Sequence, residues 1–260
     1  MKPYIDAHCH FHELSNTEVI EFCNSPNYVI IGVSDDFQSS LKTLELASRC
    51  SNLIPALGIH PWSIDELGVG AREEFTRLKN LIEEVVKKIR FIGEVGLDKV
   101  FVPKSLDIQR EVFISFLELA RDYGLALNIH SVGTWREILN LLYKYDIKLA
   151  IFHWYSGPLN LLKEFKDRGY YITVNPAITI QQKTQRVIQE ADLDILLTES
   201  DAPYDYRGMK LMPSLIPLSM DTVARIKGLS TDEVHEVIIN NFKRLVKELN
   251  INNQVLNYLP

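Results

Sequence analysis

The stretch Tyr4-Ile5-Asp6-Ala7-His8-Cys9-His10 decides how this sequence folds, because it joins a short apolar run to two histidines. Successive side chains of a β-strand point to opposite faces, so a strand here places His8 and His10 on one face. Cys9 then points to the other face, which predicts a packed structural cysteine. The paired imidazoles are candidate metal ligands.

The same arrangement, an apolar run with a histidine or carboxylate at its end, recurs further along the chain. The later runs lead to Glu94, His130, His153 and Asp201. Their continuous apolar character suits strands that are buried on both faces of a parallel sheet. We expect eight strands, over residues 4–8, 28–33, 53–58, 91–94, 125–130, 149–153, 170–174 and 195–198.

The segments between these runs have the apolar spacing of amphipathic helices. Residues 72–89 and 108–123 each carry one apolar stripe with charged side chains on the other side. A helix is also expected over 159–168, between a proline and a glycine. Ser230 with Glu233 predicts a capping box that opens a last helix ending near residue 249.

Eight alternations of strand and helix in 260 residues predict an α/β fold, a (β/α)8 TIM barrel of the metal-dependent hydrolase type. An open doubly wound sheet would normally bring a glycine-rich phosphate loop, and neither GxGxxG nor GxxxxGK[ST] occurs. We expect one hydrolase domain over residues 1–250 and a loosely packed C-terminal tail over 251–260. No stretch is long and apolar enough to span a bilayer.

Charge and cysteine content bear on partners and compartment. The net charge of −6 offers no global basic field for nucleic acid, although a local cationic metal site can bind phosphate in an acidic protein. Cys9, Cys23 and Cys50 show neither CxxC spacing nor the even count of a disulfide framework. This cysteine pattern predicts a reducing compartment. The absence of an apolar signal region predicts a cytoplasmic protein, and no feature of the sequence indicates an obligate protein partner.

The strand-end residues together have the chemistry of a divalent metal centre. Active sites of barrels lie at the C-terminal ends of the strands, so these sequence-distant groups should converge. Mixed imidazole and carboxylate ligands suit Zn, Mn, Fe, Co or Ni rather than Ca. Two such cations would clamp a scissile phosphate or carbonyl and activate a water molecule. The predicted ligands are His8, His10 and Asp201 for one cation and His130 and His153 for the other, with Glu94 as a bridge.

Five motifs occur in order along the chain. They are Asp-Ala-His-Cys-His at 6–10, Gly-Ile-His-Pro at 58–61, Gly-Glu-Val-Gly-Leu-Asp at 93–98, Gln-Arg-Glu-Val-Phe at 109–113 and Glu-Ser-Asp-Ala-Pro-Tyr at 199–204. Together they resemble the TatD family of metal-dependent deoxyribonucleases, within the amidohydrolase-like barrel enzymes. Residues 240–245 also resemble the C-terminal signature of that family.

The resemblance implies roles for individual residues. It makes the six residues above metal ligands, and it makes Asp201 and Glu94 catalytic, with Asp201 as general base. It places His60 near the substrate phosphate; the residue by itself, a histidine before a proline at a strand end, could donate to a phosphate oxygen or cap its loop. The implied cofactors are two divalent ions (Zn, Mg or Mn), and the implied substrate is DNA, as a single strand or a strand end, cut exonucleolytically.

Two departures from the family pattern keep other functions open. The family usually has arginine where this chain has Val132, and valine cannot form bidentate bonds to phosphate. The loop over 206–213 lacks the acidic residue that the family usually carries there. A second hypothesis is therefore hydrolysis of a small amide, lactone or phosphoester. A third, a non-enzymatic metal-binding barrel, fits poorly with six ligands, since structural sites typically use four.

Several residues near the strand ends have two interpretations. His12 either lies in a loop or contacts the outer shell or the substrate. Trp62, Trp154 and Tyr155 either stack on bases or pack over the rim of the barrel. His235, within the last helix, is expected to pack or to lie on the surface.

Overall fold

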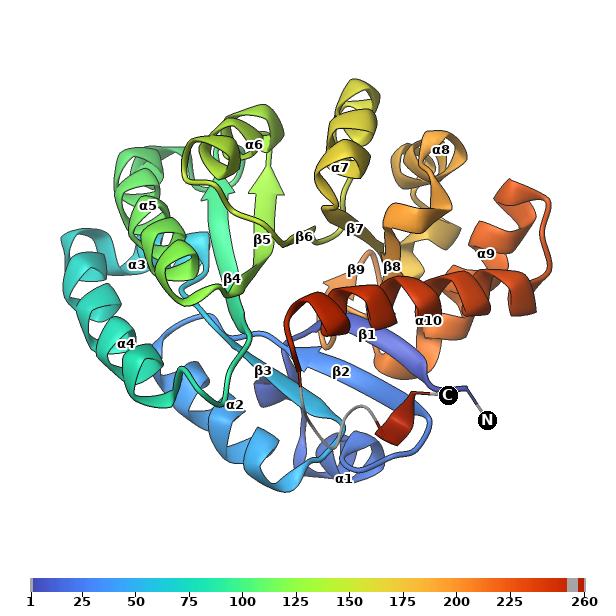
Figure 1. Ribbon diagram of the computed structural model, residues 1–260, viewed down its shortest axis with the longest axis horizontal. Coiled ribbons are helices and arrows are strands. Elements are labelled where there is room, and N and C mark those ends of the chain that lie inside the picture. Colours follow the sequence, from blue (N-terminus) through green and yellow to red (C-terminus); the bar gives the residue numbers. More distant parts are fainter. Residues whose placement is uncertain (1, 252–256, 260) are drawn as a thin grey trace.

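The computed structural model describes residues 2–251 and 257–259, in which eight parallel strands follow one another around a barrel (Figure 1). Each strand pairs in parallel with the next one along the chain. All eight predicted strands are present, which confirms the TIM barrel. They are β1 (Tyr4–Cys9), β2 (Tyr28–Gly32), β3 (Leu53–Leu57), β4 (Phe91–Asp98), β5 (Ala126–Val132), β6 (Ala150–Phe152), β7 (Tyr171–Val174) and β8 (Leu196–Thr198).

Side-chain bonds connect the first strand to the last. The Thr198 hydroxyl donates to the carbonyl of Ile5, and the Ser200 N–H donates to Asp6 Oδ1 at 2.8 Å. Asp6 is fully buried, and this burial raises its pKa to about 7. These bonds bring the end of β8 beside the end of β1.

Helices surround the strands (Figure 1). The predicted capping box is confirmed, because Ser230 Oγ accepts from the Glu233 N–H and the Ser230 N–H donates to Glu233 Oε2 at 2.8 Å. A short hairpin of β9 (Asp205–Tyr206) and β10 (Met209–Lys210) follows β8. The helices are α1 (Asn16–Phe22), α2 (Phe37–Arg49), α3 (Pro61–Leu67), α4 (Ala71–Val85), α5 (Leu106–Tyr123), α6 (Trp135–Lys144), α7 (Leu162–Arg168), α8 (Gln182–Glu190), α9 (Ile216–Lys227) and α10 (Thr231–Glu248).

Strand β4 runs four residues further than expected and contains Glu94 rather than ending at it. Its pairing with β5 shifts register between Ile92 and Val95, so the ladder is irregular on either side of Glu94. The neighbouring backbone comes very close, since a Cβ added at Gly58 would overlap the Glu94 carbonyl. Glycine at 58 is therefore a steric requirement of this arrangement.

The expectation that the cysteines form no disulfide is wrong. Cys23 and Cys50 are bonded to each other. Each residue follows the last turn of a helix, α1 or α2, and the fold brings these helix ends together. The argument for a reducing compartment therefore loses its basis. Cys9 is a buried free cysteine, as predicted.

The C-terminal tail was expected to pack loosely. Residues 252–256 and 260 of it lie outside the described residues. Ile251 is buried, and the Tyr258 hydroxyl is 2.7 Å from Ser51 Oγ. The described part of the tail thus packs against the barrel. Among the residues that the structure describes, no helix has the length and apolar character needed to cross a membrane.

The disulfide makes a testable contribution to stability. Its partners are 27 residues apart, and closing a loop of that length stabilises a fold by about 3–4 kcal/mol on the chain-entropy model. We expect C23S, or reduction of the wild type, to lower the free energy of unfolding by about that amount in a urea titration. Finding three free thiols in the denatured, unreduced protein would contradict the pairing.

Candidate metal centre

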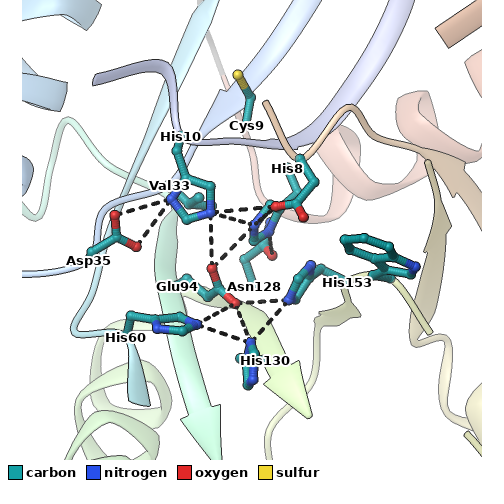
Figure 2. Close-up of polar contacts among 12 residues, drawn as sticks. His8, Cys9, His10, Val33, Asp35, His60, Glu94, Asn128, His130 and His153 are labelled. Carbon is teal, nitrogen blue, oxygen red and sulfur yellow. Dashed lines mark hydrogen bonds and ion pairs between the residues drawn. The ribbon is translucent and has the colours of Figure 1, made fainter. Parts of the chain in front are cut away.

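Four of the predicted ligands converge on the fifth, Glu94, at the C-terminal end of the barrel (Figure 2): they are His8, His10, His130 and His153. The sixth, Asp201, lies beside His8 and His10. Most of the six line a cavity of about 1700 Å³ that opens to solvent. His8 and His10 come from the end of β1 and His130 from β5, while His153 directly follows β6 and Asp201 comes three residues after β8. Residues far apart in the sequence therefore share one site, as the barrel geometry predicts.

One group of ligand atoms lies around Glu94 Oε2. His8 Nε2 is 3.2 Å from this oxygen, 3.3 Å from His10 Nε2 and 3.4 Å from Asp201 Oδ1. His10 Nε2 is 3.4 Å from Glu94 Oε2 and 3.5 Å from Asp201 Oδ1. Tetrahedral ligands bonded to Zn at its usual distances lie about 3.3 Å apart. These donors thus suit one divalent ion.

A second group lies around the other oxygen of Glu94. His130 Nδ1 and His153 Nε2 are each 2.8 Å from Glu94 Oε1, and they are 3.4 Å from one another. The rings of His8 and His153 stack with centroids 4.0 Å apart, so the two groups adjoin. A further grouping joins His153 to His8 and Asp201. The structure therefore places Glu94 between both sets of imidazoles.

Hydrogen bonds outside the centre indicate which nitrogen of His8 carries its proton. His8 Nδ1 is 2.7 Å from Asn128 Oδ1, and the Asn128 amide donates to the Ala7 carbonyl at 2.7 Å. The Asn128 oxygen therefore accepts, His8 Nδ1 donates, and His8 Nε2 presents a lone pair to Glu94. His10 follows the same logic, because its Nδ1 faces Asp35 Oδ1 at 3.1 Å.

His130 is oriented by Asp98, the last residue of β4. Its Nε2 is 3.1 Å from Asp98 Oδ2, and the Asp98 carboxylate also accepts the N–H groups of Val100 and Phe101. Burial opposes ionisation of Asp98, but the hydrogen bonds from His130, Phe101 and Trp62 lower its pKa to about 2. His130 Nε2 thus donates, and Nδ1 turns a lone pair toward Glu94.

The ring of His60 turns a donor, rather than a lone pair, toward Glu94. Its Nδ1 accepts the backbone N–H of Trp62 at 3.1 Å, because His60 is the N-cap of α3. In the neutral ring the proton is therefore on Nε2, which lies 3.1 Å from His130 Nδ1 and 3.4 Å from Glu94 Oε1. His60 is as close to the centre as the predicted ligands are, yet it offers a donor instead of a lone pair.

The electrostatics of the centre favour positive charge. Burial opposes ionisation of Glu94, but His153, His60 and His8 hold its pKa well below the usual range. Burial also disfavours the charged form of His8, yet Glu94 and Asp201 raise its pKa well above the usual range. Lone pairs and carboxylate oxygens at these distances need protons or cations between them. The donor set therefore fits divalent ions.

Sequence comparisons agree with this geometry. The family model described as TatD related DNase matches residues 5–247. The chain belongs to the TatD-related DNase family.

Individual TatD relatives match over almost their whole lengths. A protein of Methanocaldococcus jannaschii named as a metal-dependent hydrolase is 30% identical, over 94% of this chain and 97% of its own. The human deoxyribonuclease TATDN3 is 27% identical, over 94% and 95%. The crystal structure of YjjV, a TatD homologue of Escherichia coli, superposes with a TM-score of 0.82 at 26% identity, covering 95% of this chain and 97% of that one.

The residues that bond to the far sides of the histidine rings were not predicted from the sequence. Asp35 lies just after β2 and faces His10, while Asp98 and Asn128 face His130 and His8. Both aspartates follow apolar runs, a signal that could have indicated them. His12 lies beside the centre, with Nε2 3.1 Å from Asp35 Oδ2. His12 lies past the end of β1, in a short 3-10 turn, and contacts Asp35, which also faces His10.

The predicted aromatic contacts divide into two kinds. Tyr155 is 1% exposed and its hydroxyl donates to the Pro158 carbonyl at 2.7 Å, so its stacking on a substrate is excluded. Trp62 and Trp154 both line the cavity, and each indole N–H donates to a neighbouring side chain, Asp98 and Gln181 respectively. The two tryptophans remain available to a ligand.

Val132 also lines the cavity. His235 lies away from the centre, with its ring stacked on Tyr4 and its Nε2 2.9 Å from the Pro3 carbonyl, as the packing prediction required.

Metal binding should displace protons from the centre. The pKa of His130 is raised to about 9, because the bonds with Asp98 and Glu94 outweigh burial. Below that pH a proton competes for the nitrogen, so metal affinity should rise from pH 6.5 to about pH 9 and then level off. Competition titrations with a chromophoric chelator at several pH values measure this. An affinity independent of pH would contradict the raised pKa values.

His60 can be distinguished from the ligands by substitution. H60A removes a donor and should lower kcat by about 10²-fold, as loss of one oriented donor typically does. H60Q keeps an N–H in that region and should recover part of the activity. Both variants should bind as much metal as the wild type, measured by elemental analysis. Loss of one equivalent of metal in H60A would instead make His60 a ligand.

Proposed function

We propose that this chain is a divalent-metal-dependent deoxyribonuclease of the TatD type that removes nucleotides from strand ends. One observation carries the proposal: several imidazole rings, held by hydrogen bonds on their far sides, converge on one buried carboxylate, Glu94, in a cavity that opens to solvent. The name of the human relative, a deoxyribonuclease, supports DNA as the substrate.

The proposed ligands follow the two groups of atoms around Glu94. Its Oε2 adjoins the first group and its Oε1 the second, so a single carboxylate could serve two ions. When bound, Zn, Mg or Mn would act as Lewis acids toward the scissile group and make a water molecule nucleophilic near neutral pH. The proposed ligands are His8, His10 and Asp201 for one ion and His130 and His153 for the other, with Glu94 shared.

Two residues of the chain would act directly in the reaction, one as a proton acceptor and one as a hydrogen-bond donor. Burial opposes ionisation of Asp201, but hydrogen bonds from His10 and His8 hold its pKa well below the usual range. Asp201 is thus ionised near neutral pH and able to accept a proton from the attacking water. His60 points Nε2–H into the cavity and would donate to a phosphoryl oxygen, stabilising the charge that develops there.

The mouth of the cavity has groups suited to a single strand or a strand end. Lys42, Lys183 and Arg207 line it and could contact backbone phosphates. Trp62 and Trp154 line it as well, and aromatic faces bind unpaired bases with little dependence on sequence. A duplex keeps its bases stacked, so these contacts favour frayed ends.

A second candidate function is hydrolysis of a small amide, lactone or phosphoester by the same centre. Val132 at the cavity cannot hold phosphate as arginine would. Acidic side chains also line the cavity and would repel a polyanion. These are Glu13, Asp36, Glu45 and Glu66.

Cleavage of end-labelled DNA tests the proposal. Metal-stripped protein should shorten single strands from one end once Mg, Mn or Zn is added back. D201N should lower the rate by about 10²–10⁴-fold, the usual contribution of a general base. H8A should abolish cleavage because it removes a proposed ligand, and both variants should keep the wild-type circular dichroism spectrum.

Two controls separate the candidate functions. Bis-p-nitrophenyl phosphate reports phosphodiester hydrolysis without a polyanionic substrate, whereas DNA cleavage should fall steeply with added salt. Turnover of the small diester with DNA left intact would move the assignment to a small-molecule hydrolase. Full DNase activity in both D201N and H8A would overturn the site itself.

A further inference from the structure

The carboxylate of Asp98 connects the metal-facing side of the centre to the mouth of the cavity. Its Oδ2 accepts the indole N–H of Trp62 at 2.9 Å and faces His130 Nε2 at 3.1 Å. Its Oδ1 accepts the backbone N–H groups of Val100 and Phe101 at 2.9 and 2.8 Å. Asp98 is fully buried, and its bond to His130 is buried, whereas its bonds to Trp62, Val100 and Phe101 lie closer to the surface.

The side chain of Gln109 bonds to the backbone of Asp98 and to the backbone of the loop that follows it. The Asp98 N–H donates to Gln109 Oε1 at 2.8 Å, and Gln109 Nε2 donates to the carbonyls of Asp98 and Val102 at 3.3 and 2.9 Å. Gln109 is itself fully buried. This accounts for two motifs to which the proposed reaction gives no role, the end of 93–98 and the start of 109–113.

On the cavity side, the same carboxylate bonds the indole ring of Trp62 and the backbone of Phe101. Trp62 and Phe101 meet edge to face with ring centroids 5.8 Å apart, and they are 39% and 66% exposed. Both line the cavity that contains Glu94 and His130. A ring pair held in this way could contact an aromatic or heterocyclic group of a substrate at low entropic cost.

We propose that Asp98 is a positioning residue with two tasks in the reaction. It holds His130 so that Nδ1 faces Glu94, and it holds the ring pair of Trp62 and Phe101 where the substrate makes contact. The inference rests on the proposed function, because the first task concerns a metal ligand of that site. One carboxylate thus sets both the affinity for metal and the affinity for substrate.

Asparagine cannot replace Asp98 in this role. All four partners of the carboxylate are donors, as the protonation of His130 and the backbone and indole N–H groups require. The amide of asparagine is itself a donor, so either the His130 and Trp62 side or the loop side would lose its acceptor. Replacing one carboxylate oxygen with an amide nitrogen therefore removes an acceptor that this arrangement needs.

The first experiment measures metal binding without reference to activity. Zn is titrated into metal-stripped wild type, D98N and D107N against a chromophoric chelator. D107N makes the same chemical change at an exposed position on α5 and should bind as the wild type does. D98N should bind one of its ions 10–100-fold more weakly, the usual effect of losing an outer partner of a metal-bound histidine. Wild-type affinity in D98N would overturn the proposal.

The second experiment tests the ring pair at saturating metal, with labelled single-stranded DNA as substrate. D98N should keep a KM several-fold above the wild type even where added metal restores part of kcat. W62F keeps a ring but loses the indole N–H, so it should raise KM while leaving metal affinity unchanged. An unchanged KM in W62F would overturn the proposed role of Asp98 in holding the ring pair. This result does not depend on whether D98N folds.

Failure of the inference differs from failure of the proposed function. A wild-type protein that binds no divalent ion and cleaves neither DNA nor the small diester would overturn the proposed function, and this inference with it. A wild type that binds metal and cleaves DNA, with D98N indistinguishable from it, would overturn the inference alone.

Discussion

A carboxylate that is 1% exposed lies among five imidazole rings in this barrel, and the rest of the site depends on how its charge is balanced. Glu94 Oε2 faces His8 in β1 and His10 just after it, and Oε1 faces the histidines that follow β3, lie in β5 and follow β6. Burying a charge without partners is very unfavourable, so protons or cations must occupy the space between these atoms. The irregular pairing of β4 and the bare backbone of Gly58 make room for this contact.

The hydrogen bonds behind the histidines give each ring its chemical role. Asn128 and Asp98 fix the protons of His8 and His130 on the nitrogens that point away from Glu94. His60 receives a backbone N–H instead, and so presents a proton to the same space. Each histidine therefore presents a lone pair or a proton to Glu94 according to the group that bonds its other ring nitrogen.

The sequence predicts the barrel and the convergence of ligands well, because both depend on local apolar runs and on where those runs end. The outer partners depend on contacts that the runs do not encode. Asp98 was missed because the strand was expected to stop at Glu94, whereas it continues through a shift in register. The bond between Cys23 and Cys50 joins two helix ends 27 residues apart, a proximity that only the tertiary fold creates.

The meeting of β1 with β8 has a consequence for how the protein is made. His8 lies at the end of the first strand and Asp201 just beyond the last, and the Asp201 N–H donates to the His8 carbonyl at 3.0 Å. A chain synthesised only as far as β7 has every histidine of the centre but lacks this carboxylate and the strand that carries it. Contacts over such separations require closure of a very long loop. A complete set of these side chains is therefore brought together only once the first and last strands have met, which makes its assembly a marker of barrel closure.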